Sequence, residues 1–218
     1  MIGIFFNQGE VCCAGSRIII EESIHDAFVK RFAERANAMT IGNPLDNPDM
    51  GPLVSEGQLR DVLGYVQKGI EEGVTLVCGG ERYTEGECAK GYFMRPTIFD
   101  NCTPDMTIVR EEIFGPVVTI QTFQTEEEAI ALANDTIYGL AGGVFTHQLE
   151  RALRVVKEVR AGITWVNAFN PTYNEAPWGG YKMSGIGREL GVHGLEEYQE
   201  IKQVNINLTP GPAGWYEH

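Results

Sequence analysis

Apolar residues in this chain occur in two patterns, short continuous runs and longer stripes at helical spacing. Two stripes predict amphipathic helices, one built on Ile24, Phe28, Phe32, Ala36 and Met39 and the other on Leu59, Val62, Leu63, Val66 and Ile70. Gly73 is placed to end the second helix. Residues 42–52, GNPLDNPDMGP, are so rich in turn-forming residues that they predict a loop.

The short runs predict strands or extended segments, which lie at 17–20, 74–77, 92–99, 117–123, 144–145 and 162–166. Thr125 and Glu128 have capping-box spacing and predict a helix directly after the fourth run, and a further helix is expected over 149–159. Residues 79–91 predict a surface excursion. This alternation of strands and helices favours an α/β fold with a largely parallel sheet.

The boundaries follow from the same pattern. We expect one α/β domain over residues 1–199 and a separate tail over residues 200–218. Within the tail, residues 201–208 alternate polar and apolar side chains and predict a strand.

Composition narrows the function classes. Hydrophobic residues make up 43% and charged residues 22% of the 218-residue chain, as in an ordinary soluble protein. A formal net charge of −13 argues against a nucleic-acid partner and against an anionic membrane surface. No apolar run approaches the roughly 20 residues that span a bilayer, and the N-terminus has no basic region or cleavage site. Five unevenly spaced cysteines predict reduced thiols in a cytoplasmic protein, and their spacing disfavours a zinc site.

The first candidate for chemistry is the cysteine pair in residues 5–17, FFNQGEVCCAGSR. A substrate can approach a thiol flanked by small residues, and the thiolate is a strong nucleophile. The alternative is that both cysteines are inert and buried, as most cysteines in protein cores are.

Two later segments are further candidates. Glu111 and Glu112 precede the strand at 117–123, where they form either a solvated acidic turn or a site for a diol. Residues 177–190, PWGGYKMSGIGREL, contain Gly185-Ile186-Gly187, but no clear strand precedes them, so a turn is favoured over a dinucleotide-binding loop. Trp178 is either a core residue or a ring that holds an ammonium cation.

These three segments together resemble the signatures of the aldehyde dehydrogenase superfamily, F-x-N-x-G-Q-x-C-x-A-x-S-R, REEIFGPV and P-[FW]-G-G-x-K-x-S-G-x-G-R-E. The resemblance implies that Cys12 is the nucleophile and that Cys13 is a bystander. Glu10 departs from the first signature, which usually has Gln.

The resemblance also implies partners for the other positions. Glu112 would hydrogen-bond the ribose hydroxyls of the nicotinamide cofactor NAD(P), and Phe114 would pack near the nicotinamide ring. Trp178, with the late Gly214-Trp215-Tyr216, is similar to the betaine-aldehyde and aminoaldehyde branch, in which an aromatic box receives a cationic group. Phe169 and Tyr173 are expected to be neighbouring walls of that box.

Two further implications concern the third signature. Backbone carbonyls at Lys182 and Gly185 would hold a potassium ion, a role that suits a hard cation. Glu189 would belong to a charge relay, with a simple ion pair to a nearby Lys or Arg as the alternative.

By resemblance, the chain corresponds to the C-terminal catalytic portion of the family's protein. The cofactor-binding domain, the oxyanion-hole Asn and the general-base Glu of the family are not among these 218 residues, so we expect the chain alone to be inactive and to bind no cofactor. The alternative is a non-catalytic remnant that folds and self-associates. In either case a homo-oligomer is expected, with the tail strand joining another subunit rather than folding back.

Overall fold

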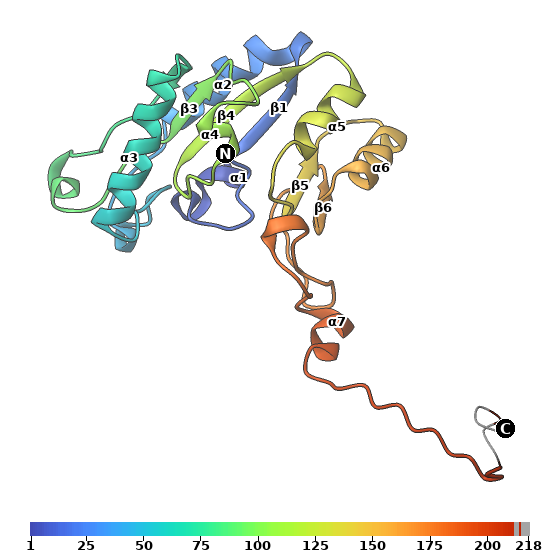
Figure 1. Ribbon diagram of the computed structural model, residues 1–218. Coiled ribbons are helices and arrows are strands. Elements are labelled where there is room, and N and C mark those ends of the chain that lie inside the picture. Colours follow the sequence, from blue (N-terminus) through green and yellow to red (C-terminus); the bar gives the residue numbers. More distant parts are fainter. Residues whose placement is uncertain (212–213, 215–218) are drawn as a thin grey trace.

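Four strands form the central sheet of this computed structural model, which describes residues 1–211 and Gly214 (Figure 1). Their order is β1 (Arg17–Glu21), β4 (Val117–Phe123), β3 (Thr97–Asp100) and β2 (Thr75–Cys78). The pairs β1–β4 and β4–β3 are parallel, whereas β2 lies antiparallel to β3 at the edge of the sheet. The predicted α/β fold with a largely parallel sheet is confirmed.

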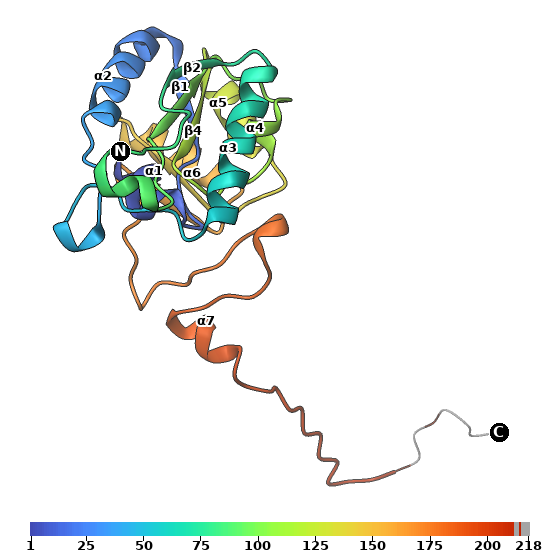
Figure 2. The same ribbon diagram turned by 90° about the vertical axis from the view of Figure 1, so that its left-hand side faces the viewer.

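Helices cover both faces of this sheet, so the body has three layers. One face carries α1 (Ile2–Phe5) and α2 (His25–Asn37), and the other carries α3 (Glu56–Glu71) and α4 (Thr107–Arg110), with the strands between α2 and α3 in Figure 2. Alternate residues of β4 enter the two apolar clusters, because successive side chains of a strand point to opposite faces. Val118 and Ile120 pack with the α2 cluster and Val117 with the α3 cluster.

The sequence pattern missed α1 and α4. Each has four residues, about one helical turn. A stripe with a period of 3.6 residues cannot be recognised over one turn, so these helices depend on what they pack against.

A second, smaller unit follows the central sheet. It consists of α5 (Glu126–Asn134), β5 (Ala141–Val144), α6 (Leu149–Glu158) and β6 (Ile163–Val166), and its two strands pair in parallel. The sequence predicted a strand at 144–145, whereas β5 ends at Val144 and begins three residues earlier. Gly142 and Gly143 carry no apolar side chain to signal a strand, and tertiary packing decides their conformation.

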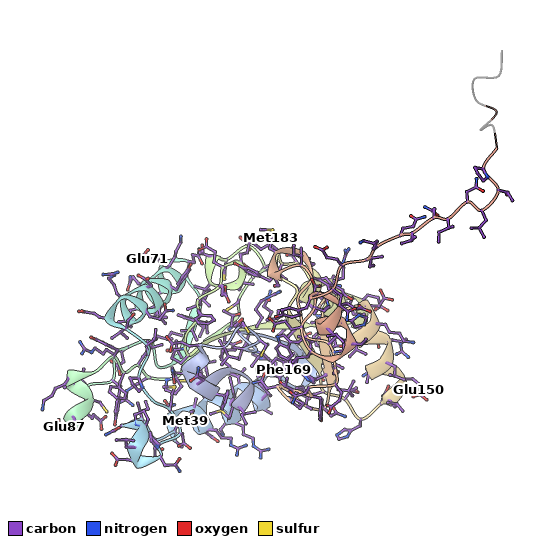
Figure 3. The ribbon with its side chains drawn as sticks, turned by 90° about the horizontal axis from the view of Figure 1, so that it is seen from below. Met39, Glu71, Glu87, Glu150, Phe169 and Met183 are labelled. Carbon is purple, nitrogen blue, oxygen red and sulfur yellow. The ribbon has the colours of Figure 1, made fainter. Side chains whose placement is uncertain are left out.

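An arm follows β6 and leads away from the body, as Figure 1 shows in orange and red. It contains the short helix α7 (Gly191–Glu196), which the sequence did not predict. Residues 200–211, which follow it, project into solvent (Figure 3). Trp215 and Tyr216, which carried part of the resemblance, lie outside the described residues.

The predicted strand over 201–208 is not formed in this single chain. Its apolar residues are exposed, with Ile201 at 101%, Val204 at 70%, Ile206 at 76% and Leu208 at 86% of full exposure. A strand needs a partner that accepts and donates its backbone hydrogen bonds, and no neighbouring edge reaches this segment within the described residues.

His25 links the first turn of α2 to the end of β3. Its Nδ1 lies 2.8 Å from Asp26 Oδ1 and its Nε2 lies 2.8 Å from Asp100 Oδ1. The side chains of His25 and Asp100 are 13% and 9% exposed. Hydrogen bonds to Asp100 first, and then to Asp26, raise the pKa of His25 above its ordinary value.

This pair predicts a stability that depends on pH. A raised pKa in the folded state stabilises the fold fully below the unfolded pKa of about 6.5, and the contribution is lost as pH rises through the higher folded pKa. The free energy of unfolding in urea should therefore fall as pH rises from about 6.5 through the folded pKa of His25.

The control is His25→Gln, which should remove this fall. Burial lowers the pKa of the Met1 amino group, an effect of opposite sign on the pH dependence that both proteins retain. The difference between the two proteins therefore isolates His25, and an identical pH dependence in both would contradict the prediction.

Candidate active site

The cysteine pair lies on a turn between the first helices and β1. The chain enters it through a tight helical turn over Phe6–Gly9, in which Asn7 and Gln8 have left-handed backbone angles (φ 50° and 47°). The Asn7 side-chain amide then donates to the Glu10 carbonyl at 3.0 Å. These short-range contacts shape the backbone that leads into the turn at Cys12 and Cys13.

Gly9 brings the first signature against the second. Its φ is 76°, and a Cβ added there would lie 2.5 Å from the carbonyl carbon of Gly115 and overlap its oxygen. Only glycine allows so close an approach of two backbones in this conformation. Two segments more than a hundred residues apart in sequence are thus in contact.

Glu10, the departure from the resembled signature, braces the turn from another side. One carboxylate oxygen accepts the Val54 backbone N–H at 3.1 Å, and the other accepts the Gln8 side-chain amide at 2.9 Å. The carboxylate therefore ties the turn to the loop before α3.

The two cysteines differ sharply in environment. Cys12 is exposed, whereas Cys13 is 7% exposed and its thiol donates to Asn170 Oδ1 at 3.4 Å. Burial, followed by the neighbouring Cys12, raises the pKa of Cys13. Of the two thiols, only that of Cys12 is open to a reactant. The exposure of Cys12 favours the hypothesis that it is a nucleophile, whereas Cys13 fits the alternative of an inert, buried cysteine.

The carboxylates of the second signature also have different roles. Glu111 accepts the Tyr65 hydroxyl at 2.9 Å and so braces α3, whereas Glu112 is exposed to solvent. Phe114 has φ 54° and is 40% exposed, and its carbonyl accepts the Gln58 side-chain amide at 2.8 Å. An exposed carboxylate beside an exposed ring fits a diol and the flat ring attached to it.

Aromatic side chains gather on the other side of the cysteine turn. The rings of Trp165 and Phe169 are 4.9 Å apart and those of Trp165 and Trp178 are 6.3 Å apart. Trp165 is buried at 8% exposure and its indole N–H donates to the Pro171 carbonyl at 3.0 Å. Tyr173 is 63% exposed and stands apart from these ring pairs.

Phe169 connects this aromatic cluster to the cysteine turn. Glycines surround its ring, and a Cβ added at Gly3, Gly15 or Gly143 would lie 3.2, 3.3 or 2.9 Å from it. Figure 3 shows Phe169 where the blue N-terminal helices meet the tan and orange segments. The sequence analysis missed Trp165, Asn170 and Gly143, because nothing local to them indicates which distant segment they face.

The third signature forms a turn closed by a backbone pair. Trp178 and Glu189 exchange two backbone hydrogen bonds of 2.7 Å each. The Glu189 side chain is exposed, and the described residues give it no ion pair with Lys or Arg. The backbone of Glu189 thus pairs with that of Trp178, and the simple ion pair considered from the sequence is not formed among the described residues. The charge relay at Glu189 stays a prediction.

The Lys182 side chain reaches the C-terminal end of α5. Its ammonium group donates to the carbonyls of Asn134 at 2.9 Å and Thr136 at 3.0 Å. Arg17, the last residue of the first signature, donates to the Leu132 carbonyl at 2.6 Å. Cations there complement the partial negative charge of the helix end. The first and third signatures thus meet on one helix terminus.

Burial and the nearness of other cations lower the pKa values of the basic side chains at this junction. Burial lowers the pKa of Arg17, and burial followed by Arg160 and Arg17 lowers the pKa of Lys182. Gly185, the other predicted potassium ligand, has φ 131°, a backbone conformation that favours glycine. Within the part of the chain that the structure describes, no cluster of His, Cys, Asp or Glu side chains could hold a metal ion.

One groove of the described residues lies away from these side chains. It has a volume of about 550 Å³ and is lined by residues 6–8 and by the loop from Pro44 to Val54. None of the candidate site residues predicted from the sequence lines this groove.

Comparison with known proteins shows which proteins the chain resembles as a whole. The profile described as "Aldehyde dehydrogenase family" matches residues 1–204. A betaine aldehyde dehydrogenase of Bacillus subtilis is 50% identical over 98% of the chain, and one of Cereibacter sphaeroides is 48% identical over the same share. Crystal structures of betaine aldehyde dehydrogenase from Staphylococcus aureus superpose with TM-scores of 0.95 and 0.96 at 44% identity over 99% of the chain, and one of them is in complex with NAD+.

The chain spans only part of those relatives. It covers 44% of the length of the two curated proteins and 43% and 44% of the two crystallised chains. Among the helices of the described residues, none combines the length and the apolar character that a membrane crossing requires.

Proposed function

Since this chain belongs to the aldehyde dehydrogenase family, we propose that it supplies the nucleophile and the substrate wall of an NAD(P)-dependent enzyme that oxidises a cationic aldehyde to a carboxylate. The observation that carries the proposal is Cys12, which is exposed on a turn held between the Phe114 segment and the aromatic cluster of Trp165, Phe169 and Trp178.

The chemistry begins at Cys12. Its thiolate attacks the aldehyde carbon, so that a C–S bond forms, the carbonyl π bond breaks, and the oxygen takes the negative charge of a thiohemiacetal. When bound, NAD(P)+ accepts the hydride that turns this adduct into a thioester. Water then adds to the thioester carbon, and its two protons pass to solvent. The C–S bond breaks and returns its electrons to the Cys12 thiolate as the carboxylate leaves.

Two residues would hold the cofactor's nicotinamide end. The exposed carboxylate of Glu112 can accept both hydrogens of a vicinal ribose diol. Phe114, fixed through its carbonyl by Gln58, offers a ring that keeps water from the reacting face.

The substrate class follows from the aromatic cluster. Trp is the best natural ring for a cation, and half-buried Trp178 rests against buried Trp165. The relatives named betaine aldehyde dehydrogenase support a cationic substrate. Tyr173, on the same segment and 63% exposed, is proposed as an outer part of the wall.

Potassium is a further proposed ligand, on the carbonyl oxygens of Lys182 and Gly185. Their left-handed backbone angles turn the chain sharply at both ends of the 182–185 turn. Carbonyl oxygens suit a hard cation. Titration with KCl against NaCl, followed by melting temperature, tests the proposal, and equal effects of the two salts would contradict it.

One prediction of the proposed function concerns the order in which the thiols react. Cys12 should be alkylated by iodoacetamide before Cys13, Cys78, Cys88 and Cys102, because it is exposed and the others are buried or half-buried. Burial raises the pKa of Cys102 to about 12, so it should react last. Peptide mapping after a brief pulse at neutral pH gives the order, and labelling of Cys13 or Cys88 first would exclude the nucleophile assignment.

All five cysteines are free thiols, which supports a reducing cytoplasmic compartment.

The second prediction concerns assembly. We propose that residues 201–208 form a strand only when another copy supplies an edge, because their apolar side chains are exposed in the single chain. Deletion of residues 200–218 should therefore lower the molar mass measured by light scattering to that of a smaller assembly. An unchanged mass per assembly, after correction for the deleted residues, would show that the tail does not hold the copies together.

A further inference from the structure

Cys13 is a buried thiol that the proposed chemistry does not use. It is 7% exposed, although the neighbouring Cys12 is open to solvent. Its thiol donates to Asn170 Oδ1 at 3.4 Å, across 157 positions of sequence. The bond joins two segments that are distant in the sequence, and ordering them costs chain entropy.

Asn170 lies in the segment that follows β6 and carries Phe169. Its backbone is left-handed, with φ 73°, and it stands between Phe169 and Pro171. Phe169 fills the space between the three glycines, while the Pro171 carbonyl accepts the Trp165 indole N–H. A movement of Asn170 would therefore shift a ring on one side and the anchor of a second ring on the other.

The bond depends on the protonated thiol. Burial raises the pKa of Cys13, so the S–H donor persists at neutral pH. The Asn170 side chain is only half-buried, so it has an alternative in water if the thiol is removed. The bond between Cys13 and Asn170 therefore fixes the position of Asn170, and its role is not only to satisfy a buried polar group.

We propose that Cys13 is a positioning residue, whose hydrogen bond to Asn170 holds the aromatic cluster at the distance from Cys12 that a cationic substrate requires. The residue after the nucleophile thereby couples the reacting thiol to the specificity wall. This inference rests on the proposed function, because the wall matters only if it receives a cationic group.

The test compares two reagents that modify Cys12 by the same chemistry in the 218-residue chain. Trimethylammonium-ethyl methanethiosulfonate is cationic and methyl methanethiosulfonate is uncharged, and both transfer a sulfenyl group to the thiolate with release of methanesulfinate. The ratio of their rate constants measures the preference for a cation, and the intrinsic reactivity of Cys12 cancels. Peptide mapping confirms that Cys12 is the residue modified.

Cys13→Ala should lower this ratio by about three- to fivefold, the loss of one hydrogen bond. Cys13→Ser retains a donor and should restore the ratio to that of the native chain. Asn170→Ala removes the same bond from the other side, so the double variant should be no worse than either single one. The emission maximum of the tryptophans should shift in Cys13→Ala and return in Cys13→Ser.

The outcomes separate this inference from the function on which it rests. Glutathione is the reference thiol for the same two reagents. If the ratio of rate constants for the native chain equals the ratio for glutathione, the cationic substrate class fails. The tryptophan emission then still decides whether Cys13 positions the wall. If Cys13→Ala and Cys13→Ser behave alike in both measurements, or if the effects of Cys13→Ala and Asn170→Ala add, Cys13 is not a positioning residue. Should Cys13→Ala fail to fold by circular dichroism, Asn170→Ala and Cys13→Ser supply the same comparison.

Discussion

Gly9→Ala should lower the free energy of unfolding by about 3 kcal/mol or more. Gly9 has φ 76°, which costs an alanine about 1 kcal/mol. The added Cβ would also overlap the carbonyl oxygen of Gly115. Backbone cannot rotate aside as a side chain can, so the two segments must separate.

Separation of Gly9 from Gly115 also predicts a functional readout. Cys12 follows Gly9 by three residues, and Phe114 precedes Gly115. The rate of Cys12 alkylation should therefore change in Gly9→Ala even below the unfolding transition. Urea denaturation and the alkylation rate at the same temperature measure the two effects.

Gly64→Ala is the matched control. Gly64 lies inside α3, and a Cβ added there would meet nothing within 4 Å. Since alanine is the better helix former, this variant should be more stable than the native chain by about 0.5–1 kcal/mol. If Gly9→Ala matched the native chain within about 0.5 kcal/mol, the described contact with Gly115 would be wrong.

Trp178→Ala in the full-length enzyme should raise KM for betaine aldehyde by about tenfold or more, because the ring would no longer hold the trimethylammonium group. The uncharged analogue 3,3-dimethylbutanal has nearly the same shape, so its KM should change about twofold or less. Steady-state kinetics with both aldehydes give the comparison.

The enzyme for this test has to be the full-length one. We expect the 218-residue chain alone to show no aldehyde oxidation, since the family's general base contributes about 10²–10⁴-fold and its oxyanion donor roughly 10²–10³-fold. Turnover by the homogeneous 218-residue chain would contradict this expectation.

Tyr173→Ala is the control for a wall residue that is 63% exposed, and its effect on KM should be smaller than that of Trp178→Ala. If Trp178→Ala raised KM equally for the charged and the uncharged aldehyde, Trp178 would be a packing residue and the cationic substrate class would lose its main support.

Much of the fold follows from local patterns. The stripes of α2 and α3 each extend over several turns, so their period can be read directly. The capping box at Thr125 is confirmed by its hydrogen bond to the Glu128 N–H at 3.2 Å, because both partners lie in one turn. The runs of branched residues in β1 and β4 are likewise local signals, and both segments form strands as predicted.

Local patterns could not show what meets across the fold. The strand predicted at 201–208 is not formed in the single chain, because a strand needs a second segment to pair with, and its formation between copies stays a prediction. The short helices α1 and α4 have too few residues for a period to appear.

For the candidate site, the sequence by itself determined which residues could react or bind: an unpaired thiol at Cys12, carboxylates at Glu111 and Glu112, and a ring at Trp178. The tertiary structure alone decided which of two similar neighbours is available. It exposes Cys12 and buries Cys13, and it engages Glu111 with Tyr65 while leaving Glu112 in solvent. The physical reason is that availability depends on burial and on hydrogen-bond partners, and both come from segments far away in the sequence.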